Sequence, residues 1–189
     1  MDRRKENIKF WYSTVLVSVI VTLMACFSHY MKHEPDVNKF RILQSIVYCN
    51  NSPSTPRGIY LRIPMLWLGR GDYVVYEPYE AVGSLASSRG WCKEGTPFLK
   101  RVRGLAGDKY TVDIKDGFYV NNRYFGRIAI LDVQGQLMPM HLGEYRVPPG
   151  EFLPVGENNS SFDGRYTGTV ARKKIQAKVI PILTEAMMP

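Results

Sequence analysis

A serine in a proline-stiffened loop and a lysine in a later apolar segment are the two residues whose types could do chemistry together. Ser54 lies in residues 51–60, which read NSPSTPRGIY, and Lys100 lies in residues 98–108, which read FLKRVRGLAGD. A serine hydroxyl becomes a strong nucleophile only when a base removes its proton, and an uncharged lysine amine can be that base. The two segments therefore predict nucleophilic catalysis by Ser54 and Lys100.

A lysine that acts as a base must be sheltered from water. With a free pKa near 10.4, only about four lysines in ten thousand are neutral at pH 7, and burial in apolar surroundings lowers the pKa. Phe98, Leu99 and Val102 surround Lys100 in a segment with strand-like alternation. This alternation turns Lys100 and Val102 to one face and Arg101 to the other, so Lys100 is expected to point inward. On this segment alone, a solvated strand lysine is the alternative.

The loop around Ser54 suits a fixed hydroxyl. Its two prolines, at positions 53 and 56, restrict the backbone and lower the entropy cost of aligning the serine. Ser52 and Thr55 are alternative nucleophiles, and a plain turn residue is the alternative without chemistry. The three histidines are scattered along the chain, so neither a Ser-His-Asp triad nor a metal or cofactor site is expected. Cys49 has no nearby histidine in the sequence and is not expected to be a nucleophile.

These segments resemble motifs of the type I signal (leader) peptidases. Residues 100–108 resemble the lysine box Lys-Arg-Val-x-Gly-Leu-x-Gly-Asp. Residues 54–60 match Ser-x-Pro-x-Gly-x-Tyr, which resembles the TraF-type peptidases of bacterial conjugation systems. The resemblance implies a serine peptidase in which the Ser52 hydroxyl joins the Ser54 backbone N–H in the oxyanion hole.

Residues 156–168 resemble a third box of the family, Gly-Asp-Asn-x-x-x-Ser-x-Asp-Ser-Arg-x-x-Gly. Here Glu and Gly replace one Asp and one Ser, and the box is shorter. The resemblance implies that Ser161 is a hydrogen-bond partner of the Lys100 amine. Asp163 either orders the site or pairs with Arg165 in a purely structural role. Because a carboxylate touching the lysine would raise its pKa, Asp163 is expected to act at one remove.

The N-terminal part of the chain predicts a membrane anchor. Residues 10–31 contain no Asp, Glu, Lys, Arg, Gly or Pro, and a helix of this length spans the hydrocarbon layer of about 30 Å. Residues 1–9 are then a cytoplasmic tail, residues 32–44 a stalk and residues 45–189 a periplasmic catalytic domain. The positive-inside count favours this orientation only slightly, so the orientation is mainly what the resemblance implies.

The cysteines leave two questions open. Residues 23–26, Leu-Met-Ala-Cys, resemble a bacterial lipoprotein cleavage box except for the Met, so a lipidated Cys26 is an alternative to the uncleaved anchor. Mass spectrometry of the mature N-terminus distinguishes the two. Cys49 and Cys92 would both be exposed to an oxidising periplasm, where they form either a disulfide or two unpaired thiols.

Short apolar or alternating runs broken by Gly, Pro and Asn predict a mainly β domain after residue 46. The expected strands are residues 59–63, 73–77, 98–102, 110–114, 118–120, 152–156 and 169–175. Residues 115–117 are expected to form a hairpin turn, with residues 121–122 forming another, and residues 80–89 a short helix. The apolar run 65–68 is expected in the core, the alternative being a lip that dips into the membrane interface.

The net charge of +8 suits an anionic membrane surface or nucleic acid, but no basic run reaches five residues, so nucleic acid is not an expected partner. The expected fold is a mainly β, signal-peptidase-like domain carried on one N-terminal transmembrane helix. The expected function is a serine endopeptidase, single-pass in the bacterial inner membrane, that processes or cyclises a conjugative pilin precursor. Expected partners are this pilin or another pre-protein, the lipid bilayer and conjugation-channel components. The alternatives are a general signal peptidase for secreted proteins and a catalytically silent subunit of a secretion or conjugation channel.

Overall fold

The computed structural model describes residue 18 and residues 45–187. By its internal contacts the chain divides into two units, residues 1–44 and residues 45–189. The expected cytoplasmic tail, anchor and stalk fall in the first unit and lie outside the described residues, apart from residue 18. In the part of the chain that is described, no helix has the length and apolar character needed to cross a membrane.

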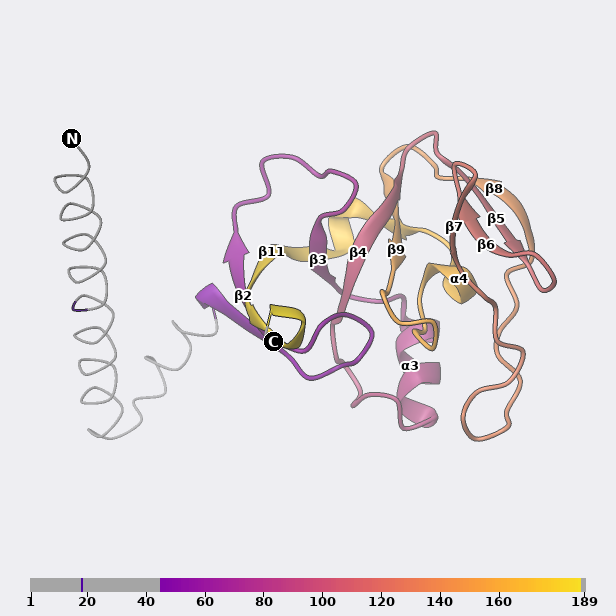
Figure 1. The fold of residues 1–189 in the computed structure, drawn as a ribbon, viewed down its shortest axis with the longest axis horizontal. Coiled ribbons are helices and arrows are strands. Elements are labelled where there is room, and N and C mark those ends of the chain that lie inside the picture. The colour runs from indigo at the N-terminus through magenta and orange to yellow at the C-terminus, as the bar shows by residue number, and fades with distance from the viewer. Residues whose placement is uncertain (1–17, 19–44, 188–189) are drawn as a thin grey trace, which may run out of the picture. The chain divides into compact units, whose positions relative to one another are not determined.

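The second unit is built from two antiparallel sheets, so the expectation of a mainly β domain is confirmed (Figure 1). The larger sheet has the order β1-β2-β11-β3-β4-β9-β10, and the smaller has the order β7-β6-β5-β8. The strands of the larger sheet are β1 (Val47–Asn50), β2 (Gly58–Ile63), β3 (Tyr73–Tyr76), β4 (Phe98–Leu105), β9 (Glu151–Val155), β10 (Val170–Ala171) and β11 (Ile175–Thr184). Those of the smaller sheet are β5 (Lys109–Asp113), β6 (Gly117–Val120), β7 (Arg123–Gly126) and β8 (Gly143–Arg146). Two helices, α3 (Glu80–Ser88) and α4 (Gly164–Thr167), and two 3-10 turns, Arg172–Lys174 and Glu185–Met187, complete the described elements.

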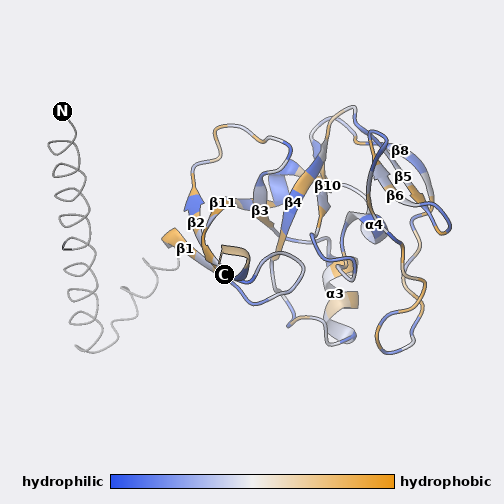
Figure 2. Ribbon diagram, in the orientation of Figure 1, coloured by the Kyte–Doolittle hydropathy of each residue, from blue (hydrophilic) through white to orange (hydrophobic). Residues whose placement is uncertain are grey.

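Strand β4 lies between β3 and β9 and separates two apolar clusters. Leu99 packs on one face with Tyr60 and Tyr73, whereas Val102 packs on the other face with Phe152. Apolar and polar residues are interspersed along the strands (Figure 2). The alternation expected for this strand is therefore confirmed, because successive side chains of a strand point to opposite faces.

The short-range predictions are confirmed. Six of the seven expected strands are present with boundaries shifted by a few residues, and the expected helix forms at Glu80–Ser88. Gly117 closes the β5–β6 hairpin at φ +95°, and Asn121 and Asn122 take the turn before β7 at φ +47° and +63°. Glycine and asparagine tolerate this left-handed region better than other residues, which is why these turns could be recognised in the sequence.

The prediction for the C-terminal region is wrong. Residues 169–175 form no single strand, because the basic run Arg172–Lys174 is a 3-10 turn between the two-residue β10 and the long β11. Strand β11 was not predicted, although it is an inner strand of the larger sheet, between β2 and β3. Its Pro181 argues against an inner strand because proline cannot donate to a ladder. The structure accommodates it where the register with β2 shifts between Pro181 and Leu183.

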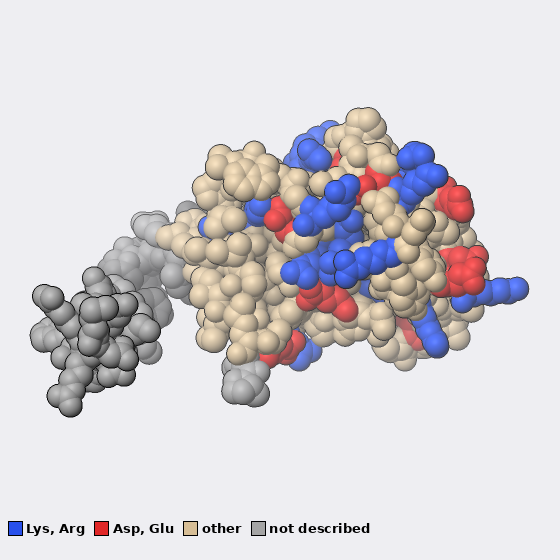
Figure 3. Space-filling model, turned by 45° about the horizontal axis from the view of Figure 1, so that its top comes forward, with Lys and Arg blue, Asp and Glu red and all other residues tan. Residues whose placement is uncertain are grey.

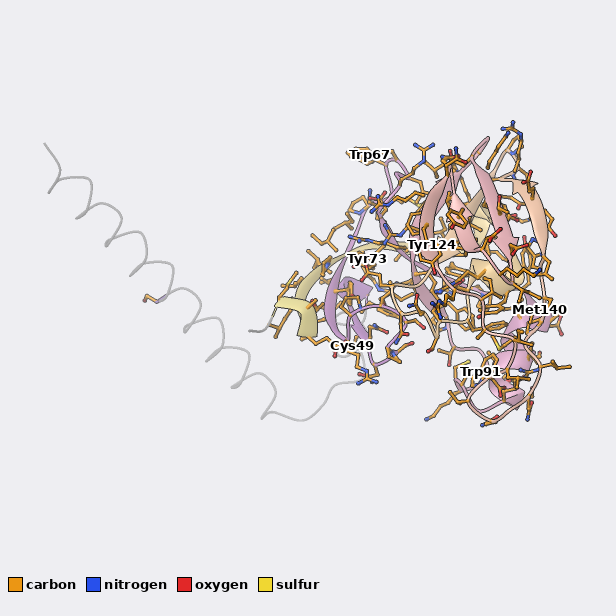
Figure 4. The ribbon with its side chains drawn as sticks, turned by 45° about the vertical axis from the view of Figure 1, so that its right-hand side comes forward. Cys49, Trp67, Tyr73, Trp91, Tyr124 and Met140 are labelled. Atoms are coloured by element: carbon orange, nitrogen blue, oxygen red, sulfur yellow. The ribbon has the colours of Figure 1, made fainter. Side chains whose placement is uncertain are left out.

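The expectation that the run 65–68 lies in the core is wrong for three of its four residues. Met65, Leu66 and Trp67 are 45%, 81% and 69% exposed, and only Leu68 packs against an apolar cluster. They belong to the connection between β2 and β3, which no further layer of described residues covers. Trp67 lies at the outer edge of the domain (Figure 4).

Candidate active site

A buried asparagine at the end of β1 holds the serine loop in shape. The Asn50 side-chain amide donates to the carbonyl oxygens of Ser52 (3.0 Å), Thr55 (3.1 Å) and Pro56 (3.0 Å). Its Oδ1 accepts a hydrogen bond from the Ser52 backbone N–H at 3.1 Å. Sequence reasoning missed Asn50, because an asparagine beside a turn is too common a signal to single out.

The hydroxyl groups of the loop have different surroundings. Thr55 is 1% exposed, and its Oγ1 already accepts a hydrogen bond from Asn50 at 3.0 Å. Ser54 is half-buried, and its hydroxyl makes no hydrogen bond to any residue that the structure describes. The Ser52 Oγ accepts a long hydrogen bond, 3.3 Å, from the Ser54 backbone N–H. The structure thus brings the two expected oxyanion donors together and leaves the Ser54 hydroxyl available.

Lys100 points into the interior from β4. Lys100 is only 4% exposed, and its Nζ donates a hydrogen bond to Ser161 Oγ at 2.8 Å. Burial lowers the pKa of Lys100 from 10.5 to about 8, with the negative charge of Asp163 opposing this shift and the positive charge of Arg165 adding to it. A neutral amine is therefore accessible close to physiological pH, as a lysine base requires.

Gly156 lies where the serine loop meets the partner of the lysine. The Glu157 backbone N–H, next in the chain, donates to the Ser54 carbonyl oxygen at 2.7 Å. A Cβ on Gly156 would come within 2.1 Å of Ser161 Oγ and 2.8 Å of the Ser54 carbonyl oxygen. The backbone of Ser54 and the hydroxyl that holds Lys100 are thus packed around one glycine. The resemblance covered this glycine but gave no hint of the close approach.

A buried ion pair supports this segment. The Asp163 carboxylate accepts from Arg165 Nε at 2.9 Å and from Nη2 at 2.7 Å, and both side chains are fully buried. Asp163 Oδ2 also accepts from the Gly156 backbone N–H at 2.7 Å. No hydrogen bond joins Asp163 to Lys100 among the described residues. Asp163 therefore affects the lysine through its charge rather than by direct contact.

The cysteines of the domain are free thiols, and one of them lies near the lysine. Cys49 is exposed and Cys92 half-buried, and no disulfide joins them in the structure. Burial raises the pKa of the Cys92 thiol, while a hydrogen bond with Thr96 and the charge of Lys100 lower it. Sequence reasoning did not place Cys92 near Lys100, because their proximity depends on how the chain between α3 and β4 folds back.

Substituting Gly156 by alanine tests the packing at this junction. We expect Gly156→Ala to displace the Ser161 hydroxyl from Lys100, because the added methyl group would overlap Ser161. Misplacing a catalytic group by about 1 Å can cost about a hundredfold in rate, and overpacking costs about 1–3 kcal/mol of stability. Peptidase assays and urea unfolding measure the two effects.

The matched control is Gly83→Ala in α3, where the new Cβ would meet only Pro78 Cγ, at 3.4 Å. It should leave activity unchanged and stabilise the helix by about 0.5–1 kcal/mol. Full activity of Gly156→Ala would show that the Lys100–Ser161 contact does not matter for catalysis.

Comparison with known proteins places this chain. A family profile described as "Signal peptidase, peptidase S26" matches residues 5–183. The plasmid transfer protein TraF of Escherichia coli is 32% identical over 147 residues, covering 71% of this chain and 81% of that protein. The crystal structure of a signal peptidase I from Enterococcus faecalis covers 59% of this chain and 96% of that chain, at 19% identity and a TM-score of 0.35. At this identity and TM-score, the structural similarity supports no conclusion about this chain.

The chain belongs to the signal peptidase family, peptidase S26, and is by class a serine peptidase. Within this family it is of the TraF type.

Proposed function

We propose that this chain is a serine endopeptidase in which Ser54 is the nucleophile and Lys100 the general base. The environment of the Lys100 amine carries the proposal. The amine of Lys100 is buried, its pKa is lowered to about 8, and its hydrogen-bond partner Ser161 packs against the same glycine as the Ser54 backbone. The Ser54 hydroxyl makes no hydrogen bond in the described part of the chain, and catalytic contacts often tighten only when substrate binds.

The mechanism that we propose is acyl transfer. The neutral Lys100 amine takes the proton from Ser54 Oγ as this oxygen attacks the scissile carbonyl carbon. The Ser54 N–H and the Ser52 hydroxyl, which lie 3.3 Å apart, would stabilise the developing oxyanion. The protonated amine then gives its proton to the departing amino group, which leaves an acyl ester on Ser54.

The substrate that we propose is a pilin precursor of a conjugation system. The relative named plasmid transfer protein TraF supports this choice over a general signal peptidase, as does the match of residues 54–60 to the TraF-type serine motif. Either water or the amino group of the substrate itself resolves the ester. Mass analysis of the product separates the two routes, because a cyclic product has no added water and no free termini.

We also propose that residues 10–31 anchor the enzyme in the inner membrane with the catalytic domain in the periplasm. The exposed Met65, Leu66 and Trp67 are consistent with an enzyme that works beside a bilayer. Protease added to spheroplasts should digest the domain from outside. Protection of the domain until the cells are lysed would contradict this orientation.

Ser54→Ala and Lys100→Ala test the proposed chemistry. Both variants should leave the precursor unprocessed while the far-UV circular dichroism spectrum remains that of the wild type. Ser84→Ala, at an exposed position of α3, is the matched control and should process normally. Precursor matured normally by the Ser54 and Lys100 variants would instead favour a catalytically silent subunit.

A further inference from the structure

Beyond Lys100, strand β4 brings two more cations to the border of the site. Arg101 and Arg103 follow on the opposite face of the strand, and Arg123 joins them from β7. Arg103 and Arg123 lie over the same Phe125 ring, with their guanidinium carbons 5.0 and 5.4 Å from its centre. Basic side chains gather over the middle of the domain in the face drawn in Figure 3.

Among the described residues, a single carboxylate forms ion pairs within this set of three arginines, and it reaches Arg101 and Arg103 but not Arg123. Glu157 Oε1 lies 2.8 Å from Arg101 Nη1 and 3.8 Å from Arg103 Nη2. The first contact is a charge-assisted hydrogen bond, whereas the second is too long for one. Positive charge therefore exceeds negative charge at this place.

Arg103 is the least satisfied member of this arginine cluster. Its guanidinium makes no hydrogen bond to any described residue, and its Nε is buried without a partner. Burial and the charge of Arg101 lower the pKa of Arg103, and Glu157 only partly opposes them. A guanidinium that has lost water without gaining acceptors is costly, and an added anion would relieve that cost.

The arginine cluster borders the loop that carries Ser54. Glu157, which pairs with Arg101, donates its backbone N–H to the Ser54 carbonyl oxygen at 2.7 Å. The side chains of Arg101 and Arg103 remain 32% and 20% exposed, so a bound ligand can reach them. A polypeptide bound at Ser54 would therefore pass close to these cations.

We propose that Arg103, together with Arg101 and Arg123, binds a carboxylate of the polypeptide substrate close to the scissile bond. The inference rests on the proposed function and adds a substrate class to it. The planar fork of a guanidinium matches a carboxylate in two parallel hydrogen bonds, which a lysine cannot form. The carboxylate comes from an acidic side chain or from the C-terminus of the substrate.

The test uses quenched fluorogenic peptides with the full-length protein in detergent micelles. Each peptide is made with Glu or with Gln near the scissile bond, and with a free or an amidated C-terminus. We expect kcat/KM to be about 10- to 100-fold higher for at least one carboxylate form than for its neutral partner, as for a charge-assisted hydrogen bond. Whether the Glu or the free C-terminus gives the advantage identifies the source of the carboxylate.

Variants then assign that preference. Arg103→Gln should bring the ratio between acid and neutral forms close to one, and Arg103→Lys should leave an intermediate ratio because it keeps the charge but loses the fork. Arg172→Gln, at an exposed position of a 3-10 turn, is the matched control and should keep the full ratio. A ratio that survives in Arg103→Gln, or that also falls in Arg172→Gln, would overturn the inference.

Binding of the same peptides to Ser54→Ala separates this inference from the proposed function. Tighter binding of a carboxylate form, lost when Arg103→Gln is added, supports the carboxylate site even if no peptide is cut. Equal binding of acid and neutral forms overturns the carboxylate site. Absence of cleavage by the wild type, with the binding preference intact, contradicts only the peptidase proposal.

Discussion

Replacing Lys100 by methionine is expected to abolish processing and, at pH 7, to make the folded domain more stable. Loss of a general base costs about 10²- to 10⁴-fold in rate. Burial lowers the pKa of Lys100 from 10.5 to about 8, which corresponds to about 3 kcal/mol of unfavourable free energy at neutral pH. Methionine fills a similar volume without a charge and should recover part of that free energy. Peptidase assays and urea unfolding at pH 7 measure both effects.

The sign of this stability effect depends on pH. Since the folded-state pKa of Lys100 lies below the unfolded value, the unfolded chain binds more protons between about pH 8 and 10.5, and wild-type stability should rise across that window. The advantage of Lys100→Met should therefore be full below about pH 8 and shrink toward pH 10.5. Lys109→Met, at an exposed position of β5, controls for the loss of one positive charge. A destabilised Lys100→Met, or an advantage shared by Lys109→Met, would contradict this account.

Replacing Asp163 by alanine is expected to be the most destabilising single change near the site. It would leave the guanidinium of Arg165, which is 0% exposed, without its carboxylate, and the Gly156 N–H without its acceptor. Breaking a buried ion pair by removing one partner costs about 3–5 kcal/mol. Urea unfolding measures the loss, and Asp116→Ala in the exposed β5–β6 turn is the control. A loss no larger than that of Asp116→Ala would show that the pair does not hold this segment.

The double variant Asp163→Ala/Arg165→Met decides between the two roles left open for Asp163. Removing both charges together should restore part of the stability, because no unpaired buried charge remains. If peptidase activity returns with stability, the pair is purely structural. If activity stays low in a stable protein, Asp163 also orders the site by holding the backbone that presents Ser161.

What the sequence predicted well depends on neighbours along the chain. The alternation around Lys100 and the positive φ of Gly117 are local properties, so the lysine strand and the hairpin could be recognised. The exposure of residues 65–67 could not be recognised, because hydrophobicity does not tell whether another layer covers a loop. Strand β11 could not be recognised either, because Pro181 argues against an inner strand. The structure accommodates this proline through the bulge against β2.

In the candidate active site, too, local features could be recognised in the sequence and long-range contacts could not. The types and order of Ser54, Lys100 and Ser161 were visible as motifs, whereas their support depends on contacts between distant parts of the chain. The closeness of Gly156 to both Ser161 and the Ser54 carbonyl is one such contact. The bonds from Asn50 across the serine loop are another. Neither leaves a distinct pattern in the sequence.

The central claim is that the Lys100 amine is neutral often enough to deprotonate Ser54, and its titration is the most direct test. The measurement is a nuclear magnetic resonance titration of the lysine 13Cε signals, with Lys100→Met to assign the resonance. We expect a midpoint near pH 8, and a kcat/KM that rises about tenfold per pH unit below the same midpoint. A Lys100 that titrates near its ordinary value of about 10.4, with a kcat/KM that does not follow it, would contradict the account.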